Sequence, residues 1–340
     1  MRINPACSVL LALTVSACNS TTAPLEPVSS FVQFEDLLET LRAQSHISAI
    51  SVAIAHDQSI VYSRGFGIAD IGEQRAATGA TVYHLASLTK PFASVVIMQL
   101  VEEGLVSLDD PVSNYGINLQ SSGIIRVRHL LSHTSEGAPG GGYSYNGNRF
   151  SLLDSVIARA TGQTFAQAIQ TRVISRIGLE QTAPKSQVNM ARGYTWKDGQ
   201  QVLTAYPSSF STAAGLTASA RDYVSFSMAM DRDALLAPST KALAYTPTVL
   251  AGGQTAPYAL GWFSTEIKGV RLIWHYGYWI ANSSLVIKVP SRGLTYVVLS
   301  NSDKLSANYP LANGRLDQSP WATAFLDAFV LGRVPLPGRE

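Results

Sequence analysis

The stretch "HLASLTKPFASVVIMQLV" (residues 84–101) places a serine, a lysine and a proline at the start of a long apolar run. Proline inside a helix loses a hydrogen bond and clashes with the preceding turn, so Pro91 fits only within the first turn. We therefore expect a helix over residues 88–103 that begins close to Ser87 and is ended by Gly104. The run is apolar around its whole circumference, which predicts a helix that is buried on all sides.

Ser87 and Lys90 are three residues apart and so share one face of this helix. In a buried setting the charged form of Lys90 is disfavoured, and a lysine in that state can take a proton from serine. Free backbone N–H groups and the positive end of the helix dipole also lie around Ser87, where they suit an anion. Ser-x-x-Lys arises by chance about once in a chain of this size, and most such pairs are solvated helix ends, so the motif alone favours that interpretation over catalysis.

Length and composition limit the number of domains and the classes of partner. The chain has 340 residues, 14% of them charged, and a formal net charge of +2 without a basic run. It can form one large domain or two ordinary ones with a substantial core. The absence of a basic stripe argues against nucleic acid as a partner.

The first residues form a separate segment. A short basic start, the apolar stretch 9–13 and the small residues 15–17 precede Cys18, which is typical of a signal peptide. A plain signal peptide is one interpretation. The "VSAC" stretch also resembles a bacterial lipoprotein signal, which implies removal of residues 1–17, lipidation of Cys18 and a membrane anchor. Residues 18–30, rich in Ser, Thr and Pro, are predicted to be a tether.

The location that follows is the bacterial cell envelope. Asn19 rather than Asp follows the cysteine, which favours the periplasm-facing side of the outer membrane if the host is Gram-negative. The two cysteines are Cys7 and Cys18, so the remaining chain cannot form a disulfide of its own.

The apolar patterns predict strands at both ends of the chain and helices between them. We expect an α+β fold in which one antiparallel sheet is built from both termini, flanked by helices, with a mostly helical insertion. The predicted domain covers residues 31–335, with sheet regions near 31–80 and 255–335 and a helical region near 81–254. The individual predictions are helices at 31–44, 126–132, 151–161, 164–176, 218–230 (opened by Thr217) and 321–331, and strands at 49–55, 59–67, 258–264, 270–275, 284–289 and 294–299.

Two further groups carry polar chemistry. "YSYNGNRF" (residues 143–150) precedes a predicted helix, and a phenol close to a lysine ammonium can have its pKa lowered enough to relay protons. "WHYGY" (residues 274–278) ends an apolar run. Taken singly, the tyrosines are better explained as aromatic residues that pack a loop, and a lone His275 is most often structural.

Together, and in this order, the three groups resemble the serine β-lactamase and penicillin-recognising hydrolase superfamily, in particular its branch of class C β-lactamases, D-alanyl-D-alanine peptidases and related esterases. The resemblance extends over roughly residues 35–305. Its segments are "GFGIAD" at 65–70, residues 84–112, "IRVRHLLSHTS" at 125–135, "IGLEQT" at 177–182, "AAGLTASARDYVSF" at 213–226, "YALGW" at 258–262 and "HYGY" at 275–278.

This resemblance implies the β-lactamase/transpeptidase-like fold, no cofactor, no metal and an acyl-enzyme on Ser87, with Lys90 as its proton partner. Tyr145 matches the family's catalytic tyrosine, because it lies seven residues before Leu152-Leu153; Tyr143 is the alternative. His275-Tyr276-Gly277 matches the family's Lys/His-Thr-Gly strand, which lines the site beside the nucleophile, and the resemblance implies a catalytic role for His275.

The same resemblance implies an oxyanion hole formed by the backbone N–H groups of Ser87 and Tyr278, and substrate contacts from Asn146, Gly147, Tyr276 and Gly277. Three differences from the family concern the substrate. Gly147 stands where an asparagine is usual, Tyr276 replaces a threonine, and His275 replaces a lysine, which weakens a fixed positive charge at pH 7.

These differences favour an esterase or amidase that acts on a small-molecule or short-peptide acyl substrate. A D-alanyl-D-alanine carboxypeptidase or a class C-like β-lactamase is the alternative, and a lipoprotein that binds penicillin or peptidoglycan without turnover is an alternative of another class. His129 and His133 lie four residues apart, but no Asp or Glu lies between them, so the sequence argues against zinc there and favours a structural helix.

Overall fold

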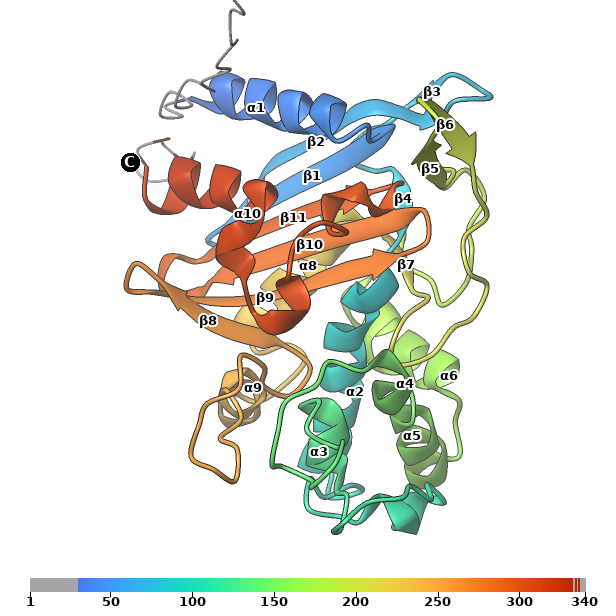
Figure 1. The fold of residues 1–340 in the computed structure, drawn as a ribbon, viewed down its shortest axis with the longest axis vertical. Helices are drawn as coiled ribbons and strands as arrows, with labels where there is room; N and C mark the ends of the chain where they lie inside the picture. Colours follow the sequence, from blue (N-terminus) through green and yellow to red (C-terminus); the bar gives the residue numbers. More distant parts are fainter. Residues whose placement is uncertain (1–29, 333, 335, 337–340) are drawn as a thin grey trace, which may run out of the picture.

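The centre of the molecule is a seven-stranded antiparallel sheet with strand order β3-β2-β1-β11-β10-β9-β8 (Figure 1). The computed structural model describes residues 30–332, 334 and 336; the predicted signal segment and most of the tether lie outside this part. The strands are β1 (Ala49–His56), β2 (Ser59–Asp70), β3 (Arg75–Ala76), β8 (Phe263–Ile267), β9 (Val270–Trp279), β10 (Asn282–Val289) and β11 (Leu294–Ser300). Both ends of the chain contribute strands, so the α+β prediction is confirmed.

The two ends meet where β1 pairs with β11, from Ile50 opposite Ser300 to His56 opposite Leu294. All eight residues of β1 are buried. Alternate side chains point to opposite faces of a strand, so Ala53 joins the core beneath one face of the sheet and Ile54 the core beneath the other. The sheet is therefore covered on both sides.

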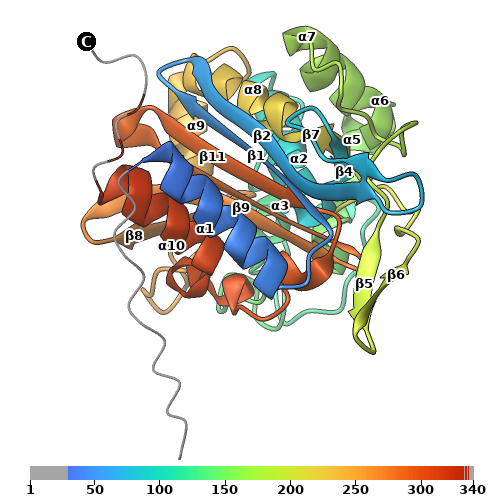
Figure 2. The same ribbon diagram turned by 90° about the horizontal axis from the view of Figure 1, so that it is seen from above.

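Figure 2 shows the resulting layers from above, with α1 (Phe31–Gln44) and α10 (Pro320–Phe325) together on one face of the sheet. Ser30 caps α1 by accepting a hydrogen bond from the Gln33 N–H at 3.2 Å. The buried Phe34 ring of α1 lies 4.9 Å from the ring of Phe329. The opposite face is covered by α8 (Ala220–Asp231), which contacts β1 and β11.

A helical region extends from this second face (Figure 1). Its central element is α2 (Thr89–Glu102), whose residues from Thr89 to Leu100 are all buried, as the unbroken apolar pattern predicts. The other helices are α3 (Val127–Leu131), α4 (Gly147–Phe150), α5 (Leu153–Thr161), α6 (Phe165–Ile169), α7 (Ser175–Ile177) and α9 (Pro238–Tyr245). No helix in the described part of the chain is long and apolar enough to cross a membrane.

Three local predictions were wrong. Thr217 does not open a helix, because residues Thr217–Ser219 form β7, which pairs with β4 (Val82–His84); Ser219 caps α8 instead. The strand expected from residue 258 begins at Phe263. The helical pattern over 164–176 is interrupted by a π-helical turn at Gln170–Ile174. The hairpin of β5 (Tyr194–Lys197) and β6 (Gln200–Leu203) was not predicted, because its sequence has no pattern that distinguishes it from a loop.

Candidate active site

Ser87 lies in a tight turn between β4 and α2. Ala86, one residue before it, has a left-handed backbone with φ of +48°, a conformation that costs an L-residue roughly 1–2 kcal/mol. Two buried side chains hold this turn: His84 Nδ1 accepts from the Ala86 N–H at 3.1 Å, and the Thr89 hydroxyl donates to the Ala86 carbonyl at 2.8 Å. Ser87 itself is in a 3₁₀ turn, Ala86–Leu88, that runs directly into α2.

Lys90 is directly beside the serine. Its Nζ donates to Ser87 Oγ at 2.8 Å and to the carbonyl of Ala213 at 2.9 Å. The side chain is 1% exposed, and this burial lowers its pKa to about 7. Near neutral pH, Lys90 is therefore uncharged in a substantial fraction of molecules and can accept a proton.

Tyr145 faces the same pair of residues. Lys90 Nζ lies 5.0 Å from the centre of the Tyr145 ring. The phenol oxygen is buried without a hydrogen bond of ordinary geometry, although Ser87 is near enough to influence its pKa. Burial, with the neighbouring Tyr276, raises the Tyr145 pKa well above 10, and this exceeds the lowering by Ser87. The expectation of a lowered pKa at this tyrosine is thus wrong, because loss of solvent is the largest effect on it.

Tyr143, the alternative, points elsewhere. Its hydroxyl donates to the carbonyl of Ala312 at 2.8 Å, so that oxygen is engaged with the C-terminal part of the chain. Of the two tyrosines, the geometry brings Tyr145 to Ser87 and Lys90.

His275 is fully buried on β9, and both of its ring nitrogens are occupied. Nδ1 lies 2.7 Å from the carbonyl oxygen of Tyr276, which can only accept, so Nδ1 carries the proton and Nε2 accepts from the Tyr258 hydroxyl at 2.9 Å. Burial, with the nearby Lys90, lowers its pKa well below 6.5. His275 is therefore neutral and engaged with neighbours, which suits support of the site better than proton exchange with a substrate.

The strand β9 passes directly against the Ser87 turn. A Cβ atom on Gly277 would lie 2.3 Å from the carbonyl oxygen of Leu85 and 2.2 Å from Ser284 Oγ, so only glycine permits this approach. Tyr278 follows on the same strand, and its side chain is half exposed. The chain thus brings the backbone of Tyr278 to the neighbourhood of Ser87, as an oxyanion hole would require.

The remaining residues that were predicted to contact the substrate differ in how free they are to do so. Asn146 caps α4 by accepting from the Arg149 N–H at 3.0 Å, and its amide nitrogen donates to Glu136; both ends of its side chain are engaged within the protein. Gly147 starts α4 beside the site, where an added Cβ would be 4.0 Å from Lys90 Nζ. Tyr276 is 8% exposed, with its ring 5.7 Å from that of Tyr145.

The structure also adds site residues that sequence reasoning missed. Ala213 acts through its backbone carbonyl, which no side-chain pattern shows, although it lies in a segment that carries the family resemblance. Tyr258 orients His275 through the hydrogen bond from its hydroxyl to Nε2. His133 lies beyond the end of α3 and contacts the Tyr145 segment, so its assignment to a structural helix was wrong.

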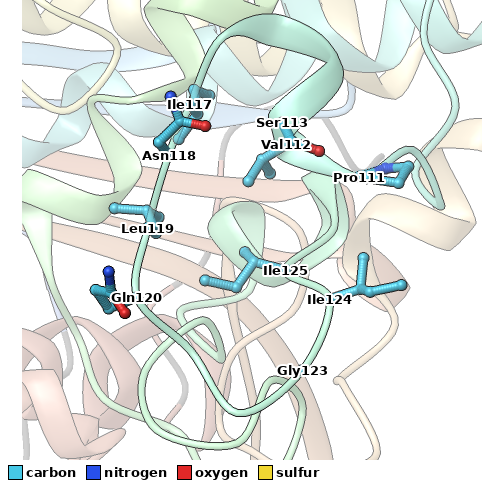
Figure 3. A pocket seen from close by; sticks show the side chains of 10 residues that line it. All are labelled: Pro111, Val112, Ser113, Ile117, Asn118, Leu119, Gln120, Gly123, Ile124 and Ile125. Carbon is cyan, nitrogen blue, oxygen red and sulfur yellow. The ribbon is translucent and has the colours of Figure 1, made fainter.

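Two pockets lie away from these residues. One of about 290 Å³ is formed by the loop before α3, where Val112, Leu119 and Ile125 surround it (Figure 3). Neither it nor the pocket of about 420 Å³ beside Tyr206 is lined by Ser87, Lys90 or Tyr145. Within the described residues no group of three or more His, Cys, Asp or Glu is arranged to hold a metal ion.

Comparisons with known proteins identify the family and the fold. The family model described as Beta-lactamase matches residues 34–318. Penicillin-binding protein 4* of Bacillus subtilis is 25% identical over 325 residues, covering 79% of this chain and 71% of its own. Esterase EstB of Burkholderia gladioli is 25% identical over 216 residues, covering 49% of this chain and 55% of its own.

Solved structures show the same fold. The octameric penicillin-binding protein homologue from Pyrococcus abyssi superposes with a TM-score of 0.77 at 23% identity, covering 87% of this chain and 77% of that one. The match over residues 34–318 includes all the strands of the central sheet and the helical region between them. The chain belongs to the Beta-lactamase family, and its relatives include proteins named as a penicillin-binding protein and an esterase.

Proposed function

We propose that this protein is a serine hydrolase that forms an acyl-enzyme on Ser87 and acts preferentially on carboxylic esters. The observation that carries the proposal is the hydrogen bond of 2.8 Å between Lys90 Nζ and Ser87 Oγ, made by a buried lysine whose pKa is about 7. A neutral amine at that distance can take the serine proton as the hydroxyl attacks a carbonyl.

The other residues have roles that follow from their positions. Negative charge that develops on the carbonyl oxygen would be stabilised by the N–H groups of Ser87 and Tyr278, each worth roughly 3 kcal/mol when well placed. The proton held by Lys90 would then pass to the leaving group, with the Tyr145 phenol as relay. Water would hydrolyse the ester on Ser87 by the reverse proton path.

The preference for an ester over a substrate with a free carboxylate rests on charge. Lys90 is buried and bonded to Ser87 and Ala213, and His275 is neutral. Neither offers a fixed cation to a substrate carboxylate, and Asn146 is occupied as a helix cap. The EstB relative is named an esterase, which supports this preference.

A second candidate is covalent capture or cleavage of penicillin or of a D-alanyl peptide. It is favoured by the Bacillus subtilis relative, which is named a penicillin-binding protein. Stoichiometric labelling of Ser87 without product release would identify a covalent receptor, whereas fast penicillin hydrolysis would identify a β-lactamase.

The test is to incubate the protein lacking residues 1–18 with p-nitrophenyl butyrate and, separately, with a fluorescent penicillin, and to locate adducts by peptide mass. We expect rapid ester turnover, an adduct on Ser87 and slow penicillin turnover. The Ser87→Ala variant should lose both reactions while its thermal unfolding is unchanged. Ester hydrolysis retained by Ser87→Ala would overturn the assignment of the nucleophile.

Lipidation of Cys18 and location at the periplasmic face of the outer membrane are part of the same proposal. They rest on the sequence around Cys18 and on the Ser- and Pro-rich segment that follows it. Metabolic labelling of the full chain with a palmitate analogue, compared with Cys18→Ala, tests the anchor.

A further inference from the structure

The segment that carries Tyr145 has no secondary structure of its own. It lies between α3, which ends at Leu131, and α4, which begins at Gly147. Neither helix nor sheet hydrogen bonds fix Tyr145, yet a catalytic phenol must be held to within about 0.5 Å of its working position. Its position has to come from side chains or from isolated hydrogen bonds.

One residue supplies such bonds on both sides of Tyr145. The Ser144 N–H donates to the His133 carbonyl oxygen at 2.9 Å. The Asn146 N–H donates to His133 Nδ1 at 3.1 Å. The backbone before Tyr145 and the backbone after it are therefore both attached to His133.

The ring of His133 also packs against Tyr145 directly. The two ring centres are 4.3 Å apart, and the Tyr258 ring lies 4.7 Å away on the same imidazole. His133 is 1% exposed. Phe150, at the end of α4, completes the packing at 5.3 Å, so the imidazole fills the space behind the Tyr145 loop.

The chemistry of the ring fits this role and argues against proton exchange. Because Nδ1 accepts from the Asn146 N–H, a neutral His133 carries its proton on Nε2. Burial is the largest effect on His133 and, with Lys90 and His275 nearby, it lowers the His133 pKa well below 6.5. Protonation of Nδ1 would remove the acceptor for Asn146, so the neutral form is the one that holds the loop.

The backbone of His133 is itself unusual, with φ of +56°. Left-handed residues other than glycine are uncommon, although Asn, Asp and His are enriched among them. This conformation turns the chain sharply after α3, so that the carbonyl and the ring of one residue both face residues 144–146.

We propose that His133 is the positioning residue for Tyr145, and that it sets the rate of acylation by holding the phenol against Ser87 and Lys90. This inference rests on the proposed function, because it assumes that Tyr145 takes part in the reaction at Ser87. His133 does not touch the substrate; it acts through Tyr145.

The test compares His133→Asn with His133→Gly. Both residues tolerate a left-handed backbone, and both remove the imidazole, but only asparagine can place an acceptor where Nδ1 was. We expect His133→Gly to lower kcat for the ester at least tenfold with KM within about threefold, and His133→Asn to recover most of that loss. Equal losses in the two variants would contradict the role of the Asn146 bond.

A second measurement separates positioning of Tyr145 from a general structural effect. In a Tyr145→Phe background the phenol is already absent, so adding His133→Gly should change kcat less than twofold if His133 acts through it. Losses that multiply in the double variant would overturn the proposal. If His133→Gly does not fold, His133→Leu replaces it: leucine fills the space without an acceptor, although the left-handed backbone is strained for it.

A third measurement does not depend on activity. Hydrogen exchange of the peptide that covers residues 144–150 should be fast in His133→Gly and slow in the wild type and in His133→Asn. If the wild type cleaves no ester and no penicillin labels it, the proposed function fails. The exchange pattern still decides whether His133 holds the loop. Unchanged protection in His133→Gly would refute that anchoring.

Discussion

Gly277 passes the carbonyl of Leu85 so closely that a single added methyl carbon would lie 2.3 Å from that oxygen. A Gly277→Ala substitution must therefore push β9 away from the Ser87 turn. Overpacking of this kind typically destabilises by about 1–3 kcal/mol, and the Tyr278 N–H should move out of reach of the reacting carbonyl. We expect kcat to fall at least tenfold and the urea midpoint to decrease.

The matched control is Gly123→Ala, where the new Cβ would meet only Pro139 at 3.6 Å, an ordinary contact. It should leave both kcat and the urea midpoint near the wild-type values. A fully active Gly277→Ala enzyme would show that the close approach of β9 is not needed for catalysis.

The lowered pKa of Lys90 predicts a specific pH dependence of kcat/KM. Only its neutral form can take the Ser87 proton, and burial lowers its pKa to about 7, so kcat/KM should rise with pH through about 7 and level off above it. His275 has a pKa well below 6.5 and should add no step in this range. Lys90→Arg should be inactive at every pH between 6 and 9, because its guanidinium stays charged.

The buried amine should also reduce the stability of the fold. The pKa of Lys90 is lowered from 10.5 to about 7. Burial of its amine therefore lowers the free energy of unfolding most below pH 7, and progressively less as the pH rises toward 10.5. We expect Lys90→Met to be inactive but more stable than the wild type, by on the order of 2 kcal/mol at pH 7, with the difference shrinking at pH 10. Denaturant unfolding at the two pH values measures this, and a destabilised Lys90→Met would contradict it.

The two tyrosines should respond differently to loss of the hydroxyl. Tyr145→Phe should lower the acylation rate by about a hundredfold or more, the usual range for a positioned proton-transfer group. Tyr143→Phe removes a hydrogen bond to Ala312 and should cost about 1 kcal/mol of stability with acylation nearly unchanged. Stopped-flow acylation compares them, and the reverse ranking would assign the relay to Tyr143.

Much of the scaffold could be predicted because local chemistry determined it. Pro91 and Gly104 bracket α2, and apolar runs marked the late strands, of which β11 pairs with β1. The start of α8 could not be predicted in this way. Thr217 is a good helix cap in isolation, but pairing of residues Thr217–Ser219 with β4 outweighs that preference.

The side chains that meet at the site were predicted better than the backbone that holds them. Ser87, Lys90 and Tyr145 were identified from motif order, and the structure brings them together. The left-handed turn at Ala86 and the carbonyl of Ala213 have no side-chain signature. His133 was misread because its partners, Ser144 and Asn146, lie more than ten residues away and use backbone N–H groups.

The position of α1 bears on how the protein would meet a membrane. α1 packs with α10 on the face of the sheet opposite the helical region that carries α2 (Figure 2). Eleven residues lie between Cys18 and Ser30, and such a tether reaches about 40 Å when fully extended. A lipid on Cys18, as proposed, would attach the protein to the bilayer from the side of the sheet that α1 covers, and a tether of this length would leave Ser87 free to face the aqueous compartment.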